Sequence, residues 1–525
     1  VNLRRQSTIR FIEEKGSAMV YGSFKDSFPN SKSRVSASLL RPAMLKRGYT
    51  VKHDKPVMND WRPWRLAAKE MVQPNAQFDP AILSDCVDAF SSEILSKLDK
   101  EWLDQIIVYD DMTAVNGCAG IRFVDKMNRN TSMGYPWCKG KKFFMEEIAP
   151  TADVPDPVEF TEEVRERIDE IITRYKNGER YHPVFTGHLK DEPTSFKKIA
   201  IAKTRVFTGG PADWSMVVRK YLLSFVRVMQ SNKFIFEAAP GTIAQSTEWG
   251  DIREYLTKFG DDRMVAGDYK FYDKRMSPQI ILAAFDIVKN VCRVAGYSAE
   301  ELQVVSCIAS DTAFPLINFN GDLIEFFGSN PSGHPLTVII NSLVNSLYIR
   351  YAYSQIVSRD VTTFQQHVAL MTYGDDNVMG VSRKIPQFNH TSISEALAAI
   401  DITYTMADKD AESVPFININ DVSFLKRTWR FDEDVGAFLC PLEHDSIEKM
   451  LTTCVVSKTV TPEVQAIAVI STALREYFFY GKDVFHEKGK MLQEVVAETN
   501  LEKYVTESTF PTYEQLVDDF WRYSA

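Results

Sequence analysis

Hydrophobic residues recur with helical spacing along much of the chain and predict several long helices. Between Phe78 and Trp102 the apolar positions are three or four residues apart, which is the period of an amphipathic helix. A second helix is predicted from Thr161 to Tyr175, because Asn177-Gly178 is a typical helix stop. The pattern from about 205 to 268 is mostly helical, and 464–480 is the clearest amphipathic stretch near the C-terminus.

Two strand patterns lead directly into acidic residues. Met264 to Asp268 is a short apolar run that ends in acidic and aromatic residues, and Val368 to Val381 has the pattern of a hairpin around Gly374-Asp375-Asp376. The first 60 residues are polar and weakly periodic, so we expect an irregular extension that wraps around another part of the protein. After Leu425 the pattern becomes helical again, and the last 80 residues are predicted to form a separate helical lobe.

Composition places the chain among ordinary globular proteins. Its 525 residues are enough for several lobes, and the proportions of hydrophobic residues (45%) and charged residues (25%) exclude a disordered or fibrous protein. We find neither an apolar run that could cross a bilayer nor a leader segment, so we expect a cytosolic protein without a membrane span. The first residue, Val1, indicates either a trimmed start or release from a larger precursor.

Cysteine and charge patterns narrow the class further. The seven cysteines are scattered and never form a CxxC pair, which argues against a disulfide framework and a structural zinc site. The net charge of -9 is an objection to nucleic-acid binding. Basic residues nevertheless cluster locally, from Gly187 to Arg205 and again at Lys139, Lys141 and Lys142. We expect basic channels on an acidic body.

Carboxylates are the first candidates for chemistry. Asp268 and Asp273 flank the end of a predicted strand, and Asp375 and Asp376 occupy the tip of the predicted hairpin. If the hairpin packs beside that strand, Asp268, Asp375 and Asp376 converge and can bind Mg²⁺. Two such ions about 4 Å apart support an in-line displacement at phosphorus. Gly-Asp-Asp alone is equally typical of an ordinary turn.

A Ser-Gly turn opens the helix that lies between these acidic segments. Ser332-Gly333 precedes Thr337 and Asn341, which are four residues apart and share one helix face. Together with Asp273 they can form a polar pocket for the hydroxyls of a ribose. The alternative, which this motif alone favours, is an N-capped helix of the protein core.

These motifs, in this order, resemble the palm of the picornavirus-like RNA-dependent RNA polymerases. The resemblance includes four further segments. The loop where the template enters resembles Thr131-Ser132-Met133-Gly134-Tyr135-Pro136, and the basic fingers segment resembles His188 to Glu192 through Lys203-Thr204-Arg205. The lysine segment after the hairpin resembles Ala407-Asp408-Lys409, and the primer grip resembles Phe424-Leu425-Lys426-Arg427. It covers residues 131–427, and the pattern suggests the insect-infecting branch near the iflaviruses and dicistroviruses.

The resemblance implies an α+β right-hand fold closed by fingertips. We expect an N-terminal extension with fingertips (1–60), fingers (61–220), the first part of the palm (221–275), an inserted part of the fingers (276–331), the second part of the palm (332–435) and a helical thumb (436–525). The palm is expected to be an antiparallel sheet with helices. The thumb is expected to carry the C-terminal amphipathic helices.

The resemblance also implies roles for individual residues. Expected catalytic residues are Asp268, Asp375, Asp376 and Lys409, of which the three aspartates bind metal; Lys409 is the candidate general acid, or else an ordinary solvated lysine. Expected nucleotide-binding residues are Asp273, Ser332, Gly333, Thr337, Asn341, Lys190, Lys198, Lys203 and Arg205, with Lys197 as an alternative to Lys198. Expected template and primer contacts are Thr131, Ser132, Gly134, Tyr135, Pro136, Leu425 and Lys426. Tyr135, Tyr269 and His334 are candidates for stacking on bases.

The implied activity is template-directed RNA synthesis from ribonucleoside triphosphates with two Mg²⁺ ions, or Mn²⁺ in their place. Implied partners are template and product RNA, a genome-linked protein primer and other viral replication proteins, at replication complexes in the host cytoplasm. Two alternatives stay open: a reverse transcriptase, and a catalytically silent RNA-binding scaffold. A zinc-dependent nuclease is disfavoured, because none of the eight histidines has metal-ligand spacing.

Overall fold

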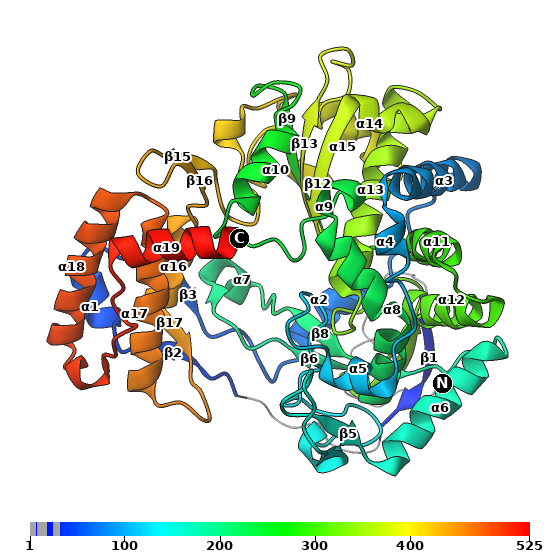
Figure 1. Ribbon diagram of the computed structural model, residues 1–525, viewed down its shortest axis with the longest axis horizontal. Helices are drawn as coiled ribbons and strands as arrows, with labels where there is room; N and C mark the ends of the chain where they lie inside the picture. Colours follow the sequence, from blue (N-terminus) through cyan, green and yellow to red (C-terminus); the bar gives the residue numbers. More distant parts are fainter. Residues whose placement is uncertain (1–6, 8–17, 25–31) are drawn as a thin grey trace.

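The computed structural model describes Ser7, Ala18–Phe24 and Lys32–Ala525 and has an α+β fold, as predicted (Figure 1). The helices are α1 (Arg41–Lys46), α2 (Arg62–Met71), α3 (Pro80–Lys97), α4 (Lys100–Leu103), α5 (Asp111–Asn116), α6 (Glu162–Lys176), α7 (Phe196–Ala200), α8 (Ala212–Ser231), α9 (Lys233–Phe236), α10 (Glu248–Leu256), α11 (Pro278–Ala295), α12 (Ala299–Ala313), α13 (Thr337–Ile356), α14 (Phe364–His367), α15 (His390–Ala398), α16 (His444–Thr452), α17 (Pro462–Phe478), α18 (Lys482–Glu498) and α19 (Tyr513–Ser524). The strands are β1 (Ala18–Ser23), β2 (Val35–Ala37), β3 (His53–Asp54), β4 (Met145–Glu147), β5 (Val158–Phe160), β6 (Val184–Leu189), β7 (Thr194–Ser195), β8 (Val206–Gly209), β9 (Met264–Tyr269), β10 (Leu316–Phe319), β11 (Asp322–Phe326), β12 (Val368–Tyr373), β13 (Asp376–Val381), β14 (Tyr404–Met406), β15 (Arg430–Asp432), β16 (Ala437–Leu439) and β17 (Thr453–Val455).

A four-stranded antiparallel sheet in the order β12-β13-β9-β14 carries the acidic residues. Strands β12 and β13 form the expected hairpin, and Gly374 at its tip has a φ of 58°, which glycine adopts without strain. In the pairing of β13 with β9, Asn377 lies opposite Gly267. This register brings Asp268 and Asp375 to the same edge of the sheet.

The central sheet separates two hydrophobic cores, because successive side chains of a strand point to opposite faces. On β9, Val265 and Tyr269 belong to a first core that also includes residues of α3, α8, α11, α12 and α13. Met264 and Ala266 belong to a second core with residues of α1, α10 and α16 to α19. Figure 1 shows α16 to α19 together on one side of the molecule, and α3, α11 and α12 on the other.

A five-stranded sheet in the order β1-β11-β10-β6-β8 places the basic residues. Strands β6 and β8 are antiparallel, with Leu189 opposite Val206. The residues at the open ends of this pair, Lys190 and Arg205, are therefore neighbours, and the Lys190 amide donates to the Arg205 carbonyl oxygen at 2.8 Å.

The N-terminal segment connects the two sides of the molecule. Strand β2 pairs with β17 beside the C-terminal helices, whereas β3 pairs with β7 next to the basic strands. Between them lies α1, whose Ala43 and Met44 are buried in the second core. The segment therefore crosses from one lobe to the other, as an extension that wraps around the body should.

The long helices that the spacing predicted are present as α3, α6, α8 and α17, whereas the long helices α11 and α12 lie in a segment for which no helix was predicted. The helix expected from 78 to 102 is divided into α3 and α4, because Leu98 has an extended backbone. Helical structure does not resume directly after Leu425, since β15 and β16 come first. The first 60 residues contain α1 and three short strands; the part of that prediction that concerns 1–6, 8–17 and 25–31 lies outside the described residues.

Among the described residues, none of the helices is both long enough and apolar enough to span a bilayer.

Candidate active site

Two of the predicted carboxylates lie at one edge of the central sheet and influence each other. Asp268, on β9, accepts a hydrogen bond from the Tyr269 amide at 2.9 Å, and its Oδ2 is 3.7 Å from Lys409 Nζ. Asp375 is at the hairpin tip, where burial and then the negative charge of Asp268 raise its pKa. A site that penalises two like charges at close range is suited to a bound cation.

Asp376, the third predicted carboxylate, makes a contact of its own with the turn at Leu425. Its Oδ2 accepts a hydrogen bond from the Leu425 amide at 2.9 Å, and burial raises its pKa to about 7. In the part of the chain that the structure describes, no three His, Cys, Asp or Glu side chains are grouped so that they could hold a metal ion. Asp268 and Asp375 by themselves are sufficient for Mg²⁺, which commonly takes one or two protein carboxylates and completes its shell with water and phosphate oxygens. The metal roles of all three aspartates stay predictions.

Helix α13 fixes the turn that carries Asp375. Asn345 donates from Nδ2 to the carbonyl oxygens of Gly374 (2.9 Å) and Asp376 (3.1 Å), and its Oδ1 accepts from the Tyr269 hydroxyl at 2.9 Å. The Ser342 hydroxyl accepts from the Gly374 amide at 3.0 Å. Neither Ser342 nor Asn345 was among the predicted site residues, although the four-residue spacing of Asn345 from the predicted ribose residue on the same helix was a usable signal.

The predicted ribose residues Asp273 and Asn341 are in contact. Asn341 donates from Nδ2 to Asp273 Oδ1 at 2.8 Å, and burial raises the pKa of Asp273 to about 6, with Asp375 as the next contributor. The Tyr272 hydroxyl donates to the Asn341 carbonyl oxygen at 2.6 Å and anchors this part of α13. The structure therefore brings together a carboxylate and an amide from two different motifs.

The Ser332-Gly333 turn is held tightly against β8. The Ser332 hydroxyl accepts from the Thr208 amide at 3.0 Å, and a Cβ on Gly333 would collide with the Thr208 carbonyl oxygen, so only glycine fits. The Thr337 hydroxyl donates within the loop, to the carbonyl oxygen of Pro331 at 2.8 Å or of His334 at 3.1 Å. In this structure Thr337 therefore closes the turn and does not point its proton at a ligand.

Basic side chains face the acidic edge, by which we mean the part of the central sheet where Asp268 and Asp375 lie. Burial raises the pKa of Asp273 and Asp375, and the charge of Arg205 opposes both shifts, which places this guanidinium close to the two carboxylates. Arg205 also contacts Glu192, with Nη1 3.3 Å from Oε1, and Lys190 Nζ is 3.7 Å from the other oxygen of Glu192. Glu192 thus holds two of the predicted phosphate-binding groups in place.

A second group of lysines lies beside the first. Lys203 Nζ is 5.0 Å from the centre of the Phe271 ring, and burial lowers its pKa, with further contributions from Lys198 and Lys409. Lys198 and Lys409, from two different segments, are therefore both close enough to repel the Lys203 ammonium, as expected where an anion binds. Lys197 and Lys198 are both exposed on α7, so the choice between them stays open.

The predicted template residues Thr131, Ser132, Gly134, Tyr135 and Pro136 form one loop. Lys141 is buried and donates to the Thr131 hydroxyl, so it is a structural residue and not part of the surface basic cluster that the sequence suggested. Gly134 has a φ of 77°, and a Cβ there would lie 2.9 Å from the Pro211 Cα. The loop is consequently fixed against the start of α8.

Leu425 and Lys426 form a tight turn next to the hairpin. Both have positive φ (57° and 61°), and Phe424 pairs with Arg427 across the turn. The hydrogen bond from the Leu425 amide to Asp376 ties this turn to the acidic hairpin. The two predicted motifs are therefore in direct contact.

The stacking hypothesis needs correction at two of its three positions. Tyr269 and His334 are only 3% and 7% exposed, because both side chains are packed inside the protein, and neither can stack on a base in this arrangement. Tyr135 is 38% exposed and keeps its candidate role.

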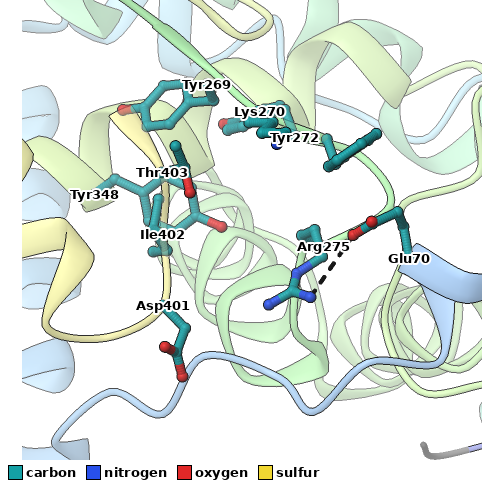
Figure 2. A pocket seen from close by; sticks show the side chains of 10 residues that line it. Glu70, Tyr269, Lys270, Tyr272, Arg275, Tyr348, Asp401, Ile402 and Thr403 are labelled. Carbon is teal, nitrogen blue, oxygen red and sulfur yellow. Dashed lines mark ion pairs between the residues drawn. The ribbon is translucent and has the colours of Figure 1, made fainter. Parts of the chain in front are cut away.

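A pocket of about 190 Å³ adjoins the candidate site. Figure 2 shows its labelled lining, with Arg275 and Glu70 facing each other at 3.8 Å. Its walls come from the residues after Asp268, from the segment before β14, and from one residue each of α2 and α13. The lining residues are Glu70, Tyr269, Lys270, Phe271, Tyr272, Arg275, Tyr348, Asp401, Ile402 and Thr403. The pocket shares β9 with the acidic edge.

An acidic hairpin beside an acidic strand end, faced by basic strands, is the arrangement of a template-dependent nucleic-acid polymerase. Over residues 38–490 the chain matches the family described as viral RNA-dependent RNA polymerase, and it belongs to that family. The prediction of an RNA-dependent RNA polymerase is thereby confirmed, and the reverse-transcriptase alternative is set aside.

Relatives and a solved structure agree with this assignment. The replicase polyprotein of Drosophila C virus is 27% identical over 514 residues, which are 93% of this chain and 28% of that polyprotein. The genome polyprotein of Deformed wing virus is 27% identical over 346 residues, 63% of this chain and 12% of the polyprotein. The chain thus spans under a third of either polyprotein. A Sicinivirus 3Dpol RNA-dependent RNA polymerase has the same fold, with a TM-score of 0.77 at 18% identity, covering 97% of this chain and 99% of that chain.

Proposed function

We propose that this chain catalyses template-directed RNA synthesis from ribonucleoside triphosphates and so replicates a positive-strand viral RNA genome. The observation that carries the proposal is the shared edge of Asp268 and Asp375, with Lys409 at 3.7 Å from Asp268 and the Asp273–Asn341 pair next to it. Acidic groups for metal, a basic group for phosphate and a polar pair for ribose thus meet in one place.

In the proposed reaction an RNA 3′-hydroxyl attacks the α-phosphate of the incoming nucleotide and pyrophosphate leaves. Two Mg²⁺ ions, or Mn²⁺ in their place, would be held by Asp268 and Asp375 with Asp376 assisting, and would activate the hydroxyl and stabilise the leaving oxygen. The Asp273–Asn341 pair would hold the ribose hydroxyls, with Ser332 and Thr337 shaping that pocket. Most of the catalysis would come from positioning and charge.

The basic residues would handle the triphosphate. Arg205 lies close to Asp273 and Asp375, and it shares a basic segment with Lys190, Lys198 and Lys203. Together these four side chains would neutralise phosphate charge. The Lys409 side chain is 63% exposed, so it has freedom to turn from Asp268 toward a departing pyrophosphate and donate a proton to it. The Thr131–Pro136 loop and the Leu425-Lys426 turn would contact template and primer.

The architecture suggests how the lobes divide this work. We assign 61–220 and 276–331 to fingers, 221–275 and 332–435 to palm, 436–525 to thumb and 1–60 to an extension with fingertips. The pairing of β2 with β17 and of β3 with β7 supports an enclosed site, because it connects the thumb side to the fingers side. A genome-linked protein primer and other replication proteins are the proposed partners, in replication complexes of the host cytoplasm.

Incorporation of labelled UMP on poly(A) with an oligo(U) primer tests this function. We expect extension with Mg²⁺ and none with EDTA, and no extension when poly(A) is replaced by poly(C). RNA that is bound but not extended would instead favour the silent scaffold, provided that the protein primer has also been supplied.

A further inference from the structure

His334 and Asn330 lie behind the ribose pair in a continuous chain of hydrogen bonds. His334 Nε2 is 3.0 Å from Asn330 Oδ1, Asn330 Nδ2 is 2.7 Å from Asn341 Oδ1, and Asn341 Nδ2 is 2.8 Å from Asp273 Oδ1. The chain therefore begins at a buried imidazole and ends at the carboxylate predicted to read the ribose.

The direction of every bond in this chain is determined. The Leu336 amide can only donate, and it lies 3.1 Å from His334 Nδ1, so the imidazole proton must be on Nε2. Asn330 consequently accepts from His334 with its oxygen and donates with its nitrogen to Asn341. Asn341 is then left with its amide nitrogen facing Asp273, which is the orientation that a carboxylate requires.

The surroundings keep the chain neutral and fixed. Asn330, His334 and Asn341 are only 4%, 7% and 6% exposed, and burial lowers the pKa of His334 to about 3. The backbone N–H of Asn330 also donates to the backbone carbonyl oxygen of Asp273 at 3.1 Å. The loop therefore holds both the backbone and the side chain of the ribose-reading acid, and no charge change of the imidazole near neutral pH disturbs it.

We propose that His334 and Asn330 are positioning residues for sugar selection, which set the orientation of the Asn341 amide and through it the Asp273 carboxylate. This inference rests on the proposed ribose pocket. It assigns a function to two buried residues that do not reach the nucleotide themselves, and it replaces the stacking role suggested for His334.

Asn330→Asp tests the polarity of the chain without changing its size. The introduced carboxylate, when ionised, accepts at both oxygens, so Asn341 must turn its nitrogen toward it and present its oxygen to the Asp273 carboxylate, which is repulsive. We expect the ratio of kcat/KM for UTP to that for dUTP to fall about tenfold, the effect of one hydrogen bond. The change should appear mainly in the KM for UTP, because the metal-binding edge is untouched.

His334→Ala is the second variant, and Asn418→Asp is the control. His334→Ala removes the donor to Asn330, and His334→Gln, which can restore a donor, should recover part of the selectivity. Asn418 accepts from the Asn420 amide at 2.9 Å, a bond that Asp can also accept, so the same amide-to-acid change there should leave the ratio unchanged. Thermal unfolding identifies any variant that has lost its fold.

Asp273→Ala and Asn341→Ala separate the inference from the function on which it rests. If these two variants retain the wild-type sugar ratio, the ribose pocket itself is wrong. If they lower the ratio while folded Asn330→Asp and His334→Ala do not, only the positioning role is overturned. In the Asn341→Ala background, His334→Ala should have no additional effect on the ratio, whereas independent additive losses would contradict the chain.

Discussion

At the scale of single residues, the candidate site combines acids that resist ionisation with bases placed to compensate. Burial raises the pKa of Asp273 to about 6 and of Asp376 to about 7, well above their usual value. The ionised form of a side chain in such a place is favoured only when a cation or a hydrogen-bond donor is close to it. Asp273 and Asp376 are therefore arranged to meet a ligand, and their ionisation lowers the free energy of unfolding when no ligand is bound.

This arrangement predicts an unusual pH dependence of stability without metal. A folded-state pKa above the unfolded value contributes stability at low pH, and that contribution is lost as pH rises through the folded pKa. In EDTA the free energy of unfolding should therefore fall between about pH 4, where these side chains ionise in the unfolded chain, and about pH 7, where Asp376 ionises in the folded protein after Asp273 at about pH 6. Asp376→Asn should flatten this slope in denaturant titrations; an equally steep slope in the variant would exclude Asp376 as its source.

At the scale of elements, α13 is the scaffold of the site. Through Ser342 and Asn345 it fixes the hairpin turn, and through Asn341 it meets Asp273. Successive polar positions of one helix thus hold two strands that are distant in sequence. The spacing of the residues, and not only their identity, sets the geometry of the acidic edge.

Asn345→Asp should uncouple the helix from the turn. The side chain is fully buried, and a carboxylate cannot donate to the carbonyl oxygens of Gly374 and Asp376. We expect kcat to fall about 100-fold with little change in nucleotide KM, because a small displacement of reacting groups is costly. Steady-state kinetics beside Asn418→Asp measure this, and an unchanged kcat in a folded variant would show that the turn holds its position alone.

Local sequence patterns predicted the elements whose stability is local. The hairpin at 368–381 follows from an apolar run that leads into a turn signal, and the helix at 162–176 from helical spacing that ends at a helix stop. Strands β2, β3, β15 and β16 are two or three residues long, too short for a pattern, and β2 and β3 pair with segments far away in sequence. The roles of His334 and Asn330 were hidden for a similar reason, because each depends on neighbours that only the fold supplies.

At the scale of the whole molecule, the two cores on either side of the central sheet are joined by the N-terminal segment. Tyr49, which follows α1, is buried in the second core, and its hydroxyl meets that of Tyr477 on α17. The Thr50 amide and hydroxyl both donate to Glu448 on α16, at 3.1 and 3.0 Å. Contacts of this kind hold the C-terminal helices against the rest of the protein.

Tyr49→Ala should therefore loosen the lobe that carries α16 to α19. We expect a loss of about 3 to 5 kcal/mol in the free energy of unfolding, and only about 1 kcal/mol for Tyr49→Phe, which keeps the ring. Fewer nucleotides should also be added per binding event, as measured by primer extension with a heparin trap. Equal stability of the two variants would show that the ring does not secure this lobe.

Asp375→Asn is the most direct test of the proposed chemistry, because it removes one negative charge from the acidic edge at nearly constant shape. UMP incorporation and RNA affinity should be measured for this variant beside Asp262→Asn, a control at an exposed acid that contacts Arg383. We expect Asp375→Asn to bind primed template like the wild type and to extend it at least about 1,000-fold more slowly, while Asp262→Asn extends it normally. Substantial extension by Asp375→Asn in Mg²⁺ would contradict the assignment of this carboxylate as an essential metal ligand.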